Sequence, residues 1–437
     1  MTICTTEQLG FPSFSRRKVQ ADFEGGDVSS DGGVLLLRQM DRRLKLTQTL
    51  AGELPDAREA SACDHAMVDL LRQRIYGLAL GYEDGNDHER LRHDIALQTA
   101  VERTDELASP ATLCRWENRA DRKAARIVHE LLIEQFIASH KKAPAELILD
   151  FDATDDAVHG KQEGRFFHGY YDHYCFLPLY VFCGTQLLVS YLRPSNMDPA
   201  RHAWAVLSLL VKRLRKAWPK VKIILRGDSG FCRWRMMRWC DRHGVFYVLG
   251  LAQNSRLNQM AERHLERARR RHEKTGQKQR FFIDLKYAAQ TWDKKRRVIL
   301  RVEHTDKGRN PRYIVTNLDD TAEHLYDQVY CARGEMENRI KEQQLDLFSD
   351  RTSCTKWWAN QFRLLLSSLA YVLVESIRRV GLKNTELAKA TCGTIRLKLF
   401  KIGAVLLRNT RRIRLHLSSA YPYRELFHLV CRRLSTA

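Results

Sequence analysis

Three acidic positions could do chemistry because of where they lie in the chain. Asp150 and Asp152 belong to the apolar stretch LILDFD, which predicts a strand, so their side chains share one face. Asp228 ends a second apolar stretch, KIILRGD, at a Gly-Asp-Ser-Gly turn. Glu337 belongs to YCARGEMENRIKEQQ, which predicts a helix. Strand ends and one helix could therefore bring carboxylates together.

The expected helix presents one stripe of polar side chains. At about 100° per residue, five of its positions return to within about 60° of one another. They are Tyr330, Arg333, Glu337, Lys341 and Gln344. Glu335 points about 140° away from Tyr330. The geometry therefore selects Glu337 as the carboxylate of this helix.

Carboxylates at strand ends, joined by one from a helix, suit a hard divalent cation such as Mg²⁺ or Mn²⁺. Two such ions about 4 Å apart can activate an attacking oxygen and stabilise the leaving 3′ oxygen of an in-line phosphoryl displacement. That is nuclease or strand-transfer chemistry. An acidic residue at a strand end also commonly forms a turn or caps a helix, so position alone leaves each of the three open.

The elements that must position these residues alternate between strands and helices. Short β-rich stretches predict strands at 147–152, 177–184, 186–192, 222–228 and 245–250, the first three as a meander. A long amphipathic helix is expected at 199–218. A helix at 255–274 and three more strands, at 281–288, 297–304 and 312–317, look like an inserted antiparallel layer. The order predicts a mixed sheet covered by helices.

The chain is expected to divide into five parts. They are a helical N-terminal region at 1–140, a mixed strand-and-helix part at 141–254, a basic β-rich insertion at 255–320, C-terminal helices carrying Glu337 at 321–380, and a basic C-terminal region at 381–437.

The charge balance makes nucleic acid the first partner to consider. The 437 residues include 73 Lys and Arg against 52 Asp and Glu, a formal net charge of +21. Nucleic acids are the abundant polyanions that could neutralise such an excess. Residues 261–301 hold 14 basic against 5 acidic residues, and 378–414 hold 11 against one. Each stretch is either a solvated face or a phosphate contact.

Composition excludes several other classes. A hydrophobic fraction of 44% with 10 prolines excludes a disordered or collagenous chain. The 11 cysteines contain no CxxC pair, which argues against a disulfide framework or a thiolate zinc site. The start lacks the pattern of a secretory signal, and the most apolar run, Leu364–Val374, is too short to cross a bilayer. We therefore expect a soluble, intracellular protein.

Three motifs in this order, LDFDAT, LRGDSGF and Y-x2-R-x3-E on a helix, resemble those of the DDE transposases of bacterial insertion sequences. The chain is most similar to the branch with the Tyr-Arg-Glu-Lys signature, and within it to the insertion-sequence group numbered thirteen-eighty. The resemblance implies an α/β fold with an RNase H-like (retroviral-integrase-like) catalytic core and a β-rich insertion. A mostly helical N-terminal DNA-binding region would precede this core.

The resemblance also assigns the catalytic and metal-binding residues. The family's first aspartate precedes a small residue and a threonine, which selects Asp152 over Asp150. The second is Asp228, and the glutamate is Glu337. These three would hold two Mg²⁺ or Mn²⁺ ions per active site. The implied activity is cleavage at insertion-sequence ends and strand transfer into target DNA, which is cut-and-paste transposition.

Further implications concern DNA. In the family, the tyrosine and arginine of the helix motif contact the strand beside the cleavage point, roles that would fall on Tyr330 and Arg333. The family's lysine position is Gln344 here, and Lys341, one turn earlier, is the candidate to replace it. The implied partners are double-stranded DNA, as terminal inverted repeats and as target, and a second copy of the chain in the DNA complex. The implied location is the nucleoid in a bacterial cytoplasm.

Other residues have weaker links to DNA. Trp292, beside Asp-Lys-Lys-Arg-Arg in the basic insertion, is a candidate for stacking on an unpaired base. Arg115 lies on a short expected helix and faces either DNA or solvent, since the sequence shows no full helix-turn-helix pattern. Trp357 and Trp358 are expected to pack rather than to stack on bases. Three histidines lack a metal-ligand spacing and are expected to be structural or near DNA; they are His159, His168 and His173.

Two other functions remain open. The stretch from Asp150 to Thr154 fits the DxDxT signature of aspartate-nucleophile phosphatases, in which the first carboxylate attacks phosphorus. Those enzymes resemble one another in a later GDxxxD loop, but Cys232 occupies the place of its second acid here. The other alternative is a non-catalytic DNA-binding protein, such as a decayed transposase.

Overall fold

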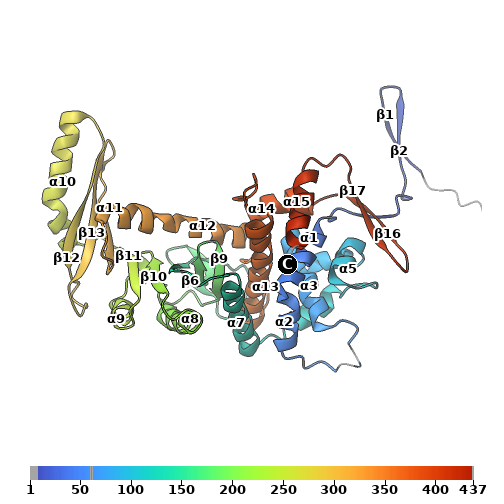
Figure 1. Cartoon of the computed structure of the whole chain (residues 1–437), viewed down its shortest axis with the longest axis horizontal. Coiled ribbons are helices and arrows are strands. Elements are labelled where there is room, and N and C mark those ends of the chain that lie inside the picture. The colour runs from blue at the N-terminus through green and yellow to red at the C-terminus, as the bar shows by residue number, and fades with distance from the viewer. Residues whose placement is uncertain (1–7, 60, 62, 436–437) are drawn as a thin grey trace, which may run out of the picture. The chain divides into compact units, whose positions relative to one another are not determined.

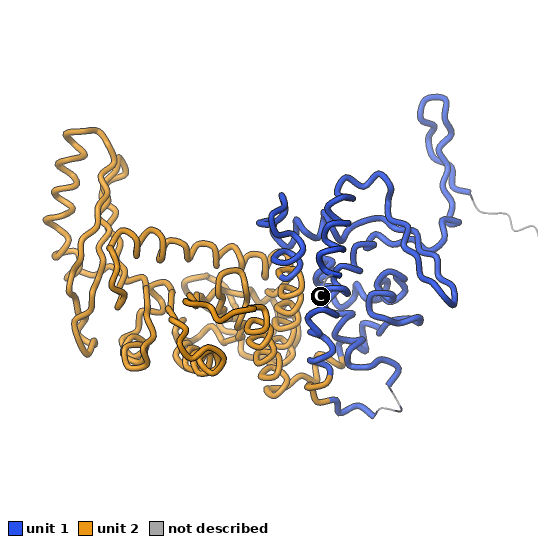
Figure 2. Tube along the Cα trace, viewed as in Figure 1, with its two compact units in different colours: residues 1–51, 56–114, 376–437 blue, residues 52–55, 115–375 orange. Residues whose placement is uncertain are grey.

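The computed structural model describes most of the chain, namely residues 8–59, 61 and 63–435. The chain forms two compact units (Figure 2). Unit 1 comprises residues 1–51, 56–114 and 376–437, and unit 2 comprises residues 52–55 and 115–375. Unit 1 is therefore built from both ends of the sequence, and unit 2 is formed by the chain between them.

Unit 2 is built on one nine-stranded sheet (Figure 1). From edge to edge its strands are β12 (Gln279–Tyr287), β13 (Arg296–Thr305), β15 (Arg312–Thr316), β11 (Phe246–Leu251), β10 (Lys222–Gly227), β4 (Glu146–Ala153), β8 (Leu179–Cys183) and β9 (Gln186–Tyr191), and β14 (Gly308–Arg309) pairs with β13. The three strands β4, β10 and β11 are parallel, and the other pairings are antiparallel. The eight predicted strands are confirmed to within two residues at each end, and β4, β8 and β9 form the expected meander.

One face of this sheet is covered by four amphipathic helices. They are α7 (Arg122–Ala138), α8 (Ala203–Ala217), α9 (Trp234–Arg242) and α10 (Ser255–Thr275). Their apolar sides pack in one core against the strands, from Leu149 of β4 to Leu300 of β13. The helices predicted at 199–218 and 255–274 are confirmed as α8 and α10.

The opposite face carries a helical segment at 322–346 (Figure 1). Its consecutive parts are α11 (Ala322–His324), the π-helical η4 (Leu325–Tyr330), the 3₁₀-helical η5 (Cys331–Arg333), α12 (Gly334–Lys341) and the π-helical η6 (Glu342–Asp346). Leu325 and Tyr326 pack on Ile224 of β10 and Val248 of β11. The helix α13 (Trp357–Ser376) follows.

The basic insertion does not form a layer of its own. β15 pairs antiparallel with β11, so β12, β13 and β15 lengthen the sheet that carries β4 and β10. Helix α10 covers the same face of the sheet as α8 and α9. The insertion therefore shares one core with the rest of unit 2.

A smaller sheet follows β4. It has the order β5-β7-β6, with β5 at Asp156–Ala157, β6 at Phe166–His168 and β7 at His173–Phe176. The ring of Trp357 packs edge to face on Phe176, with centroids 5.4 Å apart. The predicted packing role of Trp357 is confirmed.

Unit 1 combines helices with short strands. The helices are α1 (Val34–Leu44), α2 (Leu46–Glu53), α3 (Met67–Leu80), η2 (Gly85–Asp87), α4 (His88–Leu91), α5 (Ile95–Val101), η7 (Ile377–Gly381), α14 (Cys392–Ile395), η8 (Arg396–Phe400) and α15 (Arg424–Ser435). The strands β3 (Asp27–Ser29), β16 (Ala404–Arg408) and β17 (Ile413–Leu417) form one sheet, and β1 (Leu9–Phe14) pairs with β2 (Arg17–Ala21). In its described part, the region expected to be mostly helical thus also contains three strands.

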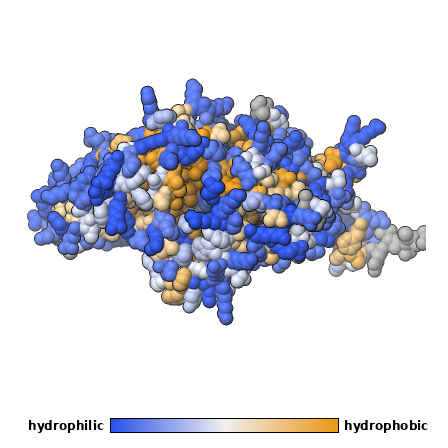
Figure 3. All heavy atoms as spheres, turned by 90° about the horizontal axis from the view of Figure 1, so that it is seen from below, coloured by the Kyte–Doolittle hydropathy of each residue, from blue (hydrophilic) through white to orange (hydrophobic). Residues whose placement is uncertain are grey.

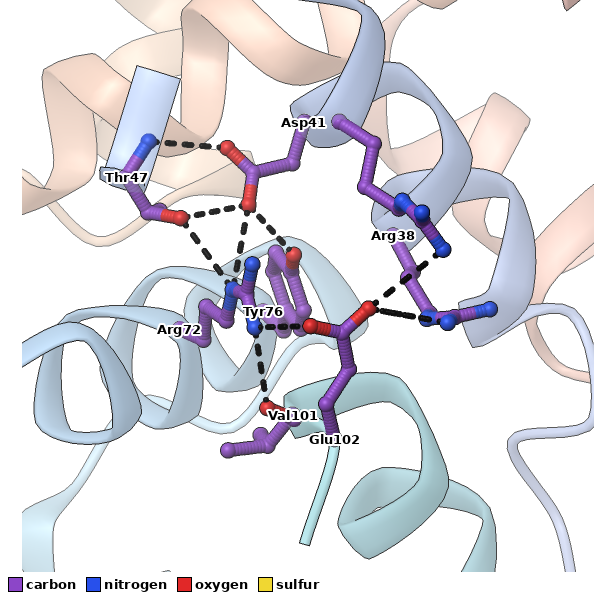
Figure 4. Close-up of polar contacts among 8 residues, drawn as sticks. Arg38, Asp41, Thr47, Arg72, Tyr76, Val101 and Glu102 are labelled. Carbon is purple, nitrogen blue, oxygen red and sulfur yellow. Dashed lines mark hydrogen bonds and ion pairs between the residues drawn. The ribbon is translucent and has the colours of Figure 1, made fainter. Parts of the chain in front are cut away.

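A polar network crosses the interior of unit 1 (Figure 4). The buried carboxylate of Asp41 accepts hydrogen bonds from the Tyr76 hydroxyl, at 2.7 Å, and from the backbone and hydroxyl of Thr47. The guanidinium of Arg72 lies 3.5 Å from Asp41 and 2.7 Å from Glu102. Because a buried charge needs partners, the network couples α1, α3 and the end of α5.

Charged and polar residues cover much of the face seen in Figure 3. Among the described residues, no helix is both long enough and apolar enough to span a bilayer.

Candidate active site

Register places two aspartates side by side. β4 and β10 pair in parallel, with Arg226 opposite Asp150 and Gly227 opposite Phe151. The next step along both strands brings Asp152 level with Asp228. Because side chains alternate along a strand, both carboxylates emerge on the face that carries the 322–346 segment.

The third parallel strand contributes a glycine at the same level. Gly227 lies opposite Leu249 of β11, so Gly250 is level with Asp228. A methyl group on Gly250 would lie 2.6 Å from the Tyr330 hydroxyl and 2.9 Å from the backbone nitrogen of Ser229. The absence of a side chain at this position lets the tyrosine of the helical segment approach the Asp228 turn.

A buried ion pair anchors the helical segment to the sheet. The guanidinium of Arg226 donates to both carboxylate oxygens of Asp150, with Nη2 2.7 Å from Oδ2. It also donates to the carbonyl oxygen of Val329, in η4. The side chain of Asp150 is only 3% exposed and that of Arg226 8%. Asp150 is therefore occupied in holding the segment that carries the glutamate.

Arg333 joins two of the three predicted carboxylates. Its Nη1 donates to Oδ2 of Asp152 at 3.0 Å, and its Nη2 donates to Oε1 of Glu337 at 2.7 Å. Asp152 is 15% exposed and Glu337 49%. A single guanidinium therefore holds the end of β4 and the helix α12 together.

The electrostatics of the site are those of crowded carboxylates. Burial raises the pKa of Asp152 to about 6, Arg333 opposes that rise, and the charges of Asp228 and Glu337 add to it. Burial lowers the pKa of Arg333, but its carboxylate neighbours outweigh burial and raise that pKa overall. Three carboxylates share one guanidinium here, so the site has an excess of negative charge.

The sequence matches the family model described as "Transposase DDE domain group 1" over residues 11–437. The chain belongs to this DDE transposase family. Comparison with the curated proteins finds no match. Among solved structures, the cryo-EM structure of the piggyBac transposase synaptic complex with hairpin DNA is similar, with a TM-score of 0.43 and 11% sequence identity, over 85% of this chain and 79% of that chain.

Two further positions of the glutamate helix in this DDE transposase, Lys341 and Gln344, differ in their surroundings. Lys341 is exposed on α12. Gln344 donates to the carbonyl of Asp155 at 2.9 Å and to Oδ1 of Asp156 at 3.0 Å. Burial raises the pKa of Asp156 well above its usual range. The residue at the family's lysine position thus bonds to the chain just after β4.

Two further candidates lie outside this group. Trp292 is half-buried against the core, with its ring edge to face with Tyr287 at 5.5 Å and the guanidinium of Arg296 5.8 Å from its centroid. Arg115 is exposed on α6 (Pro110–Glu117), where unit 1 ends and unit 2 begins.

Sequence reasoning missed two residues that shape the site. Arg226 was read only as part of an apolar strand, although an arginine inside such a strand signals a buried partner. Gly250 ends the apolar stretch VFYVLG, where a glycine can mark close approach of another chain segment. Both lie on the face that carries the carboxylates.

Replacing Gly250 by alanine is expected to lower DNA cleavage by about 10- to 100-fold and to cost about 1–3 kcal/mol of folding free energy. The new methyl group would push the Tyr330 hydroxyl and the Ser229 backbone away from their positions, and small displacements in a catalytic site cost about that much. The check is the single-turnover cleavage rate. Gly403→Ala, just before β16, has open space and no positive φ, and it is expected to leave cleavage unchanged; an unchanged rate in Gly250→Ala would refute this role.

Proposed function

We propose that this chain is a cut-and-paste transposase that cleaves DNA at insertion-sequence ends and joins the freed 3′ ends to target DNA. The observation that carries the proposal is the level placement of Asp152 and Asp228 on adjacent parallel strands, with Glu337 tied to Asp152 through Arg333. Family membership supports the same reaction class.

The catalytic core would be RNase H-like. The order β9-β8-β4-β10-β11, an antiparallel meander followed by two parallel strands reached through helices, supports this proposal. The strands β12, β13 and β15 would then be the insertion of the Tyr-Arg-Glu-Lys branch. Lys341 would take the part of the family's lysine, since Gln344 bonds to Asp155 and Asp156.

The site residues fit divalent cations. In the described structure no three acidic, histidine or cysteine side chains are close enough together to form a finished metal site, and Arg333 lies between Asp152 and Glu337. The donor set consists of carboxylate oxygens. Burial raises the pKa of Asp152, and repulsion from Asp228 and Glu337 adds to that rise; Mg²⁺ or Mn²⁺ would relieve such repulsion. Two bound ions would supply activation of the attacking oxygen and stabilisation of the leaving oxygen. Asp152, Asp228 and Glu337 would hold them.

The protein's own groups would position the DNA. Tyr330, beside Asp228, and Arg333, between two carboxylates, would contact the strand next to the scissile phosphate. The excess of basic residues would bind the flanking phosphates, so affinity should fall steeply with salt. Concerted cutting of two ends requires two active sites, which supports a homodimer on DNA. The protein would act at the bacterial nucleoid, because its terminal inverted repeats and its target DNA lie there.

The structure disfavours the phosphatase alternative. In that class the first aspartate of DxDxT attacks phosphorus, and here that residue is Asp150. Its carboxylate is 3% exposed and accepts two hydrogen bonds from Arg226. A carboxylate so engaged cannot reach a substrate, whereas Asp152 is partly open.

The test is cleavage of DNA carrying the element's terminal inverted repeats, with Mg²⁺ and with EDTA, alongside turnover of para-nitrophenyl phosphate. We expect Mg²⁺-dependent nicking at the repeat ends and no ester turnover. Ester turnover that is lost in Asp150→Asn would establish the phosphatase instead. Repeat-specific binding without cutting in Mg²⁺ would establish a non-catalytic DNA-binding protein.

Asp152→Asn is expected to stabilise the metal-free protein at pH 8 by about 3 kcal/mol while it abolishes cleavage. The pKa of Asp152 is about 6 in the folded protein and about 3.9 in an unfolded chain. The folded state therefore binds the extra proton between these values, and wild-type stability falls as pH rises from about 4 to about 6. Urea denaturation with EDTA at pH 4 and pH 8 checks this. The control Asp306→Asn removes a carboxylate that is 95% exposed; an equal gain there would contradict the assignment.

A further inference from the structure

A hairpin at residues 166–176 exposes aromatic rings on the surface of unit 2. Eight of its side chains are rings: Phe166, Phe167, His168, Tyr170, Tyr171, His173, Tyr174 and Phe176. Four are strongly exposed, at 41% for Phe166, 53% for Phe167, 85% for Tyr170 and 47% for Tyr174. Exposed aromatic surface in such a cluster is costly in water and typically marks a binding site.

The two faces of the hairpin differ. Phe167 lies opposite Tyr174, and His168 lies opposite His173, so the two pairs point to opposite faces. On the first face the rings of Phe167 and Tyr174 meet edge to face at 5.7 Å. The guanidinium of Arg165 lies 4.4 Å from the centroid of Tyr174. That face combines aromatic surface with positive charge.

The second face lies beside the chain segment that follows Asp152. Nε2 of His173 lies 2.8 Å from Oδ2 of Asp155, three residues after Asp152. β7 also pairs with β5, which begins at the following residue, Asp156. The pKa of Tyr171 is raised to about 12 by burial and by the nearby charges of Asp155 and Asp152. The hairpin is therefore fastened beside the end of β4.

Tyr170 is the most open ring of the group. It lies in the turn between β6 and β7, and its ring meets Tyr171 edge to face at 5.0 Å. Tyr171 in turn packs on His168, with centroids 4.9 Å apart. A half-buried tyrosine thus supports an exposed one close to the active site. Trp292, by contrast, is half-buried against the core.

We propose that this hairpin binds unpaired nucleobases of the DNA end beside the cleaved bond, with Tyr170 as the main stacking ring. The proposal rests on the proposed function, which brings a DNA end to Asp152. Bases inside a duplex are covered on both faces, whereas an unpaired base offers a free face to an aromatic ring. Arg165 would contact the adjoining phosphates. Stacking of this kind is independent of base sequence.

The test compares two DNAs that carry the same terminal repeat, one blunt and one with a short single-stranded end containing 2-aminopurine. The proteins are the full-length wild type, Tyr170→Ala, Tyr170→Phe and Trp204→Ala; Trp204 lies on α8 and is 52% exposed. We expect Tyr170→Ala to raise the Kd for the single-stranded end about tenfold and the Kd for the blunt end less than about twofold. Tyr170→Phe and Trp204→Ala should match wild type, and only Tyr170→Ala should lose quenching of 2-aminopurine.

Equal Kd changes on both DNAs, or no change on either, would overturn the proposal. Because Tyr170 is 85% exposed in a turn, its variants should unfold at the wild-type temperature, so a binding change is not a folding change. Failure of the proposed function looks different. Wild-type protein that binds the ends without cutting them refutes the transposase assignment, while the two Kd values still decide the role of Tyr170. Wild-type protein that binds neither DNA refutes both.

Discussion

Asp228→Asn is expected to lower the rate of DNA cleavage by on the order of 10³-fold, because it removes one of the three carboxylates that would hold the divalent cations. The fold should not change. Oδ1 of Asp228 accepts a hydrogen bond from the backbone nitrogen of Gly230 at 2.8 Å, and an asparagine oxygen can accept the same bond. The measurement is single-turnover cleavage of a terminal-repeat DNA in Mg²⁺.

A pair of variants on one helix sharpens that result. Glu337→Gln removes the carboxylate that Arg333 binds. It should lower the rate of DNA cleavage about as much as Asp228→Asn does. Glu335→Gln, two residues earlier and also exposed on α12, should cleave within about twofold of wild type, since surface substitutions have small effects. Near-normal cleavage by Asp228→Asn, or loss of cleavage in Glu335→Gln alone, would show that the catalytic group is misassigned.

Arg226→Met is expected to lower the free energy of unfolding by about 3–5 kcal/mol. The change leaves the buried carboxylate of Asp150 without its cation, which is the costly way to break a buried ion pair. It also removes the bond to the Val329 carbonyl, so the segment carrying Glu337 loses its tie to β10. The measurement is urea denaturation, with cleavage assayed on the fraction that remains folded.

Arg213→Met is the matched control for Arg226→Met. Arg213 pairs with Glu134 at the surface, with side chains 33% and 50% exposed, and such pairs contribute at most about 1 kcal/mol. The double variant Arg226→Met/Asp150→Leu should recover part of the lost stability, because no unpaired charge remains. Equal losses from Arg226→Met and Arg213→Met would show that the pair with Asp150 has no special role.

Local pattern predicted the strands and the face of the aspartates. The apolar runs around Asp152 and Asp228 are confirmed as β4 and β10, and alternation correctly places Asp150 and Asp152 on one face. What the pattern lacked was register. Only pairing in space shows that Arg226 stands opposite Asp150, and hence that Asp150 is a positioning residue while Asp152 is left open.

The stripe on the glutamate helix was predicted in part. The expectation used 100° per residue throughout, but η4, η5 and η6 are wound as π and 3₁₀ turns. Arg333 and Glu337 do meet, since they lie four residues apart. Across the change into η6 the rotation per residue differs. There Lys341 is exposed, whereas Gln344 reaches Asp155 and Asp156.

Long-range association was beyond sequence reasoning. The stretches 281–288, 297–304 and 312–317 showed strand character, but nothing in them indicated that β15 would pair with β11. The same holds for the joining of residues 376–437 with residues 1–114 in unit 1. The assembly of unit 1 depends on partners hundreds of residues away, and the pairing of β15 depends on a choice among strands of similar composition. Periodicity encodes neither.

The discontinuity of unit 1 has a consequence for synthesis on the ribosome. Its first part ends at Cys114 and its second begins at Ser376, so the nascent N-terminal part waits while about 260 intervening residues are translated. At about 5–20 residues per second that delay is roughly 13–50 s. Unit 2 is complete earlier and can fold first. A premature stop codon shortly after Ser376 would therefore release a complete unit 2 together with an incomplete unit 1.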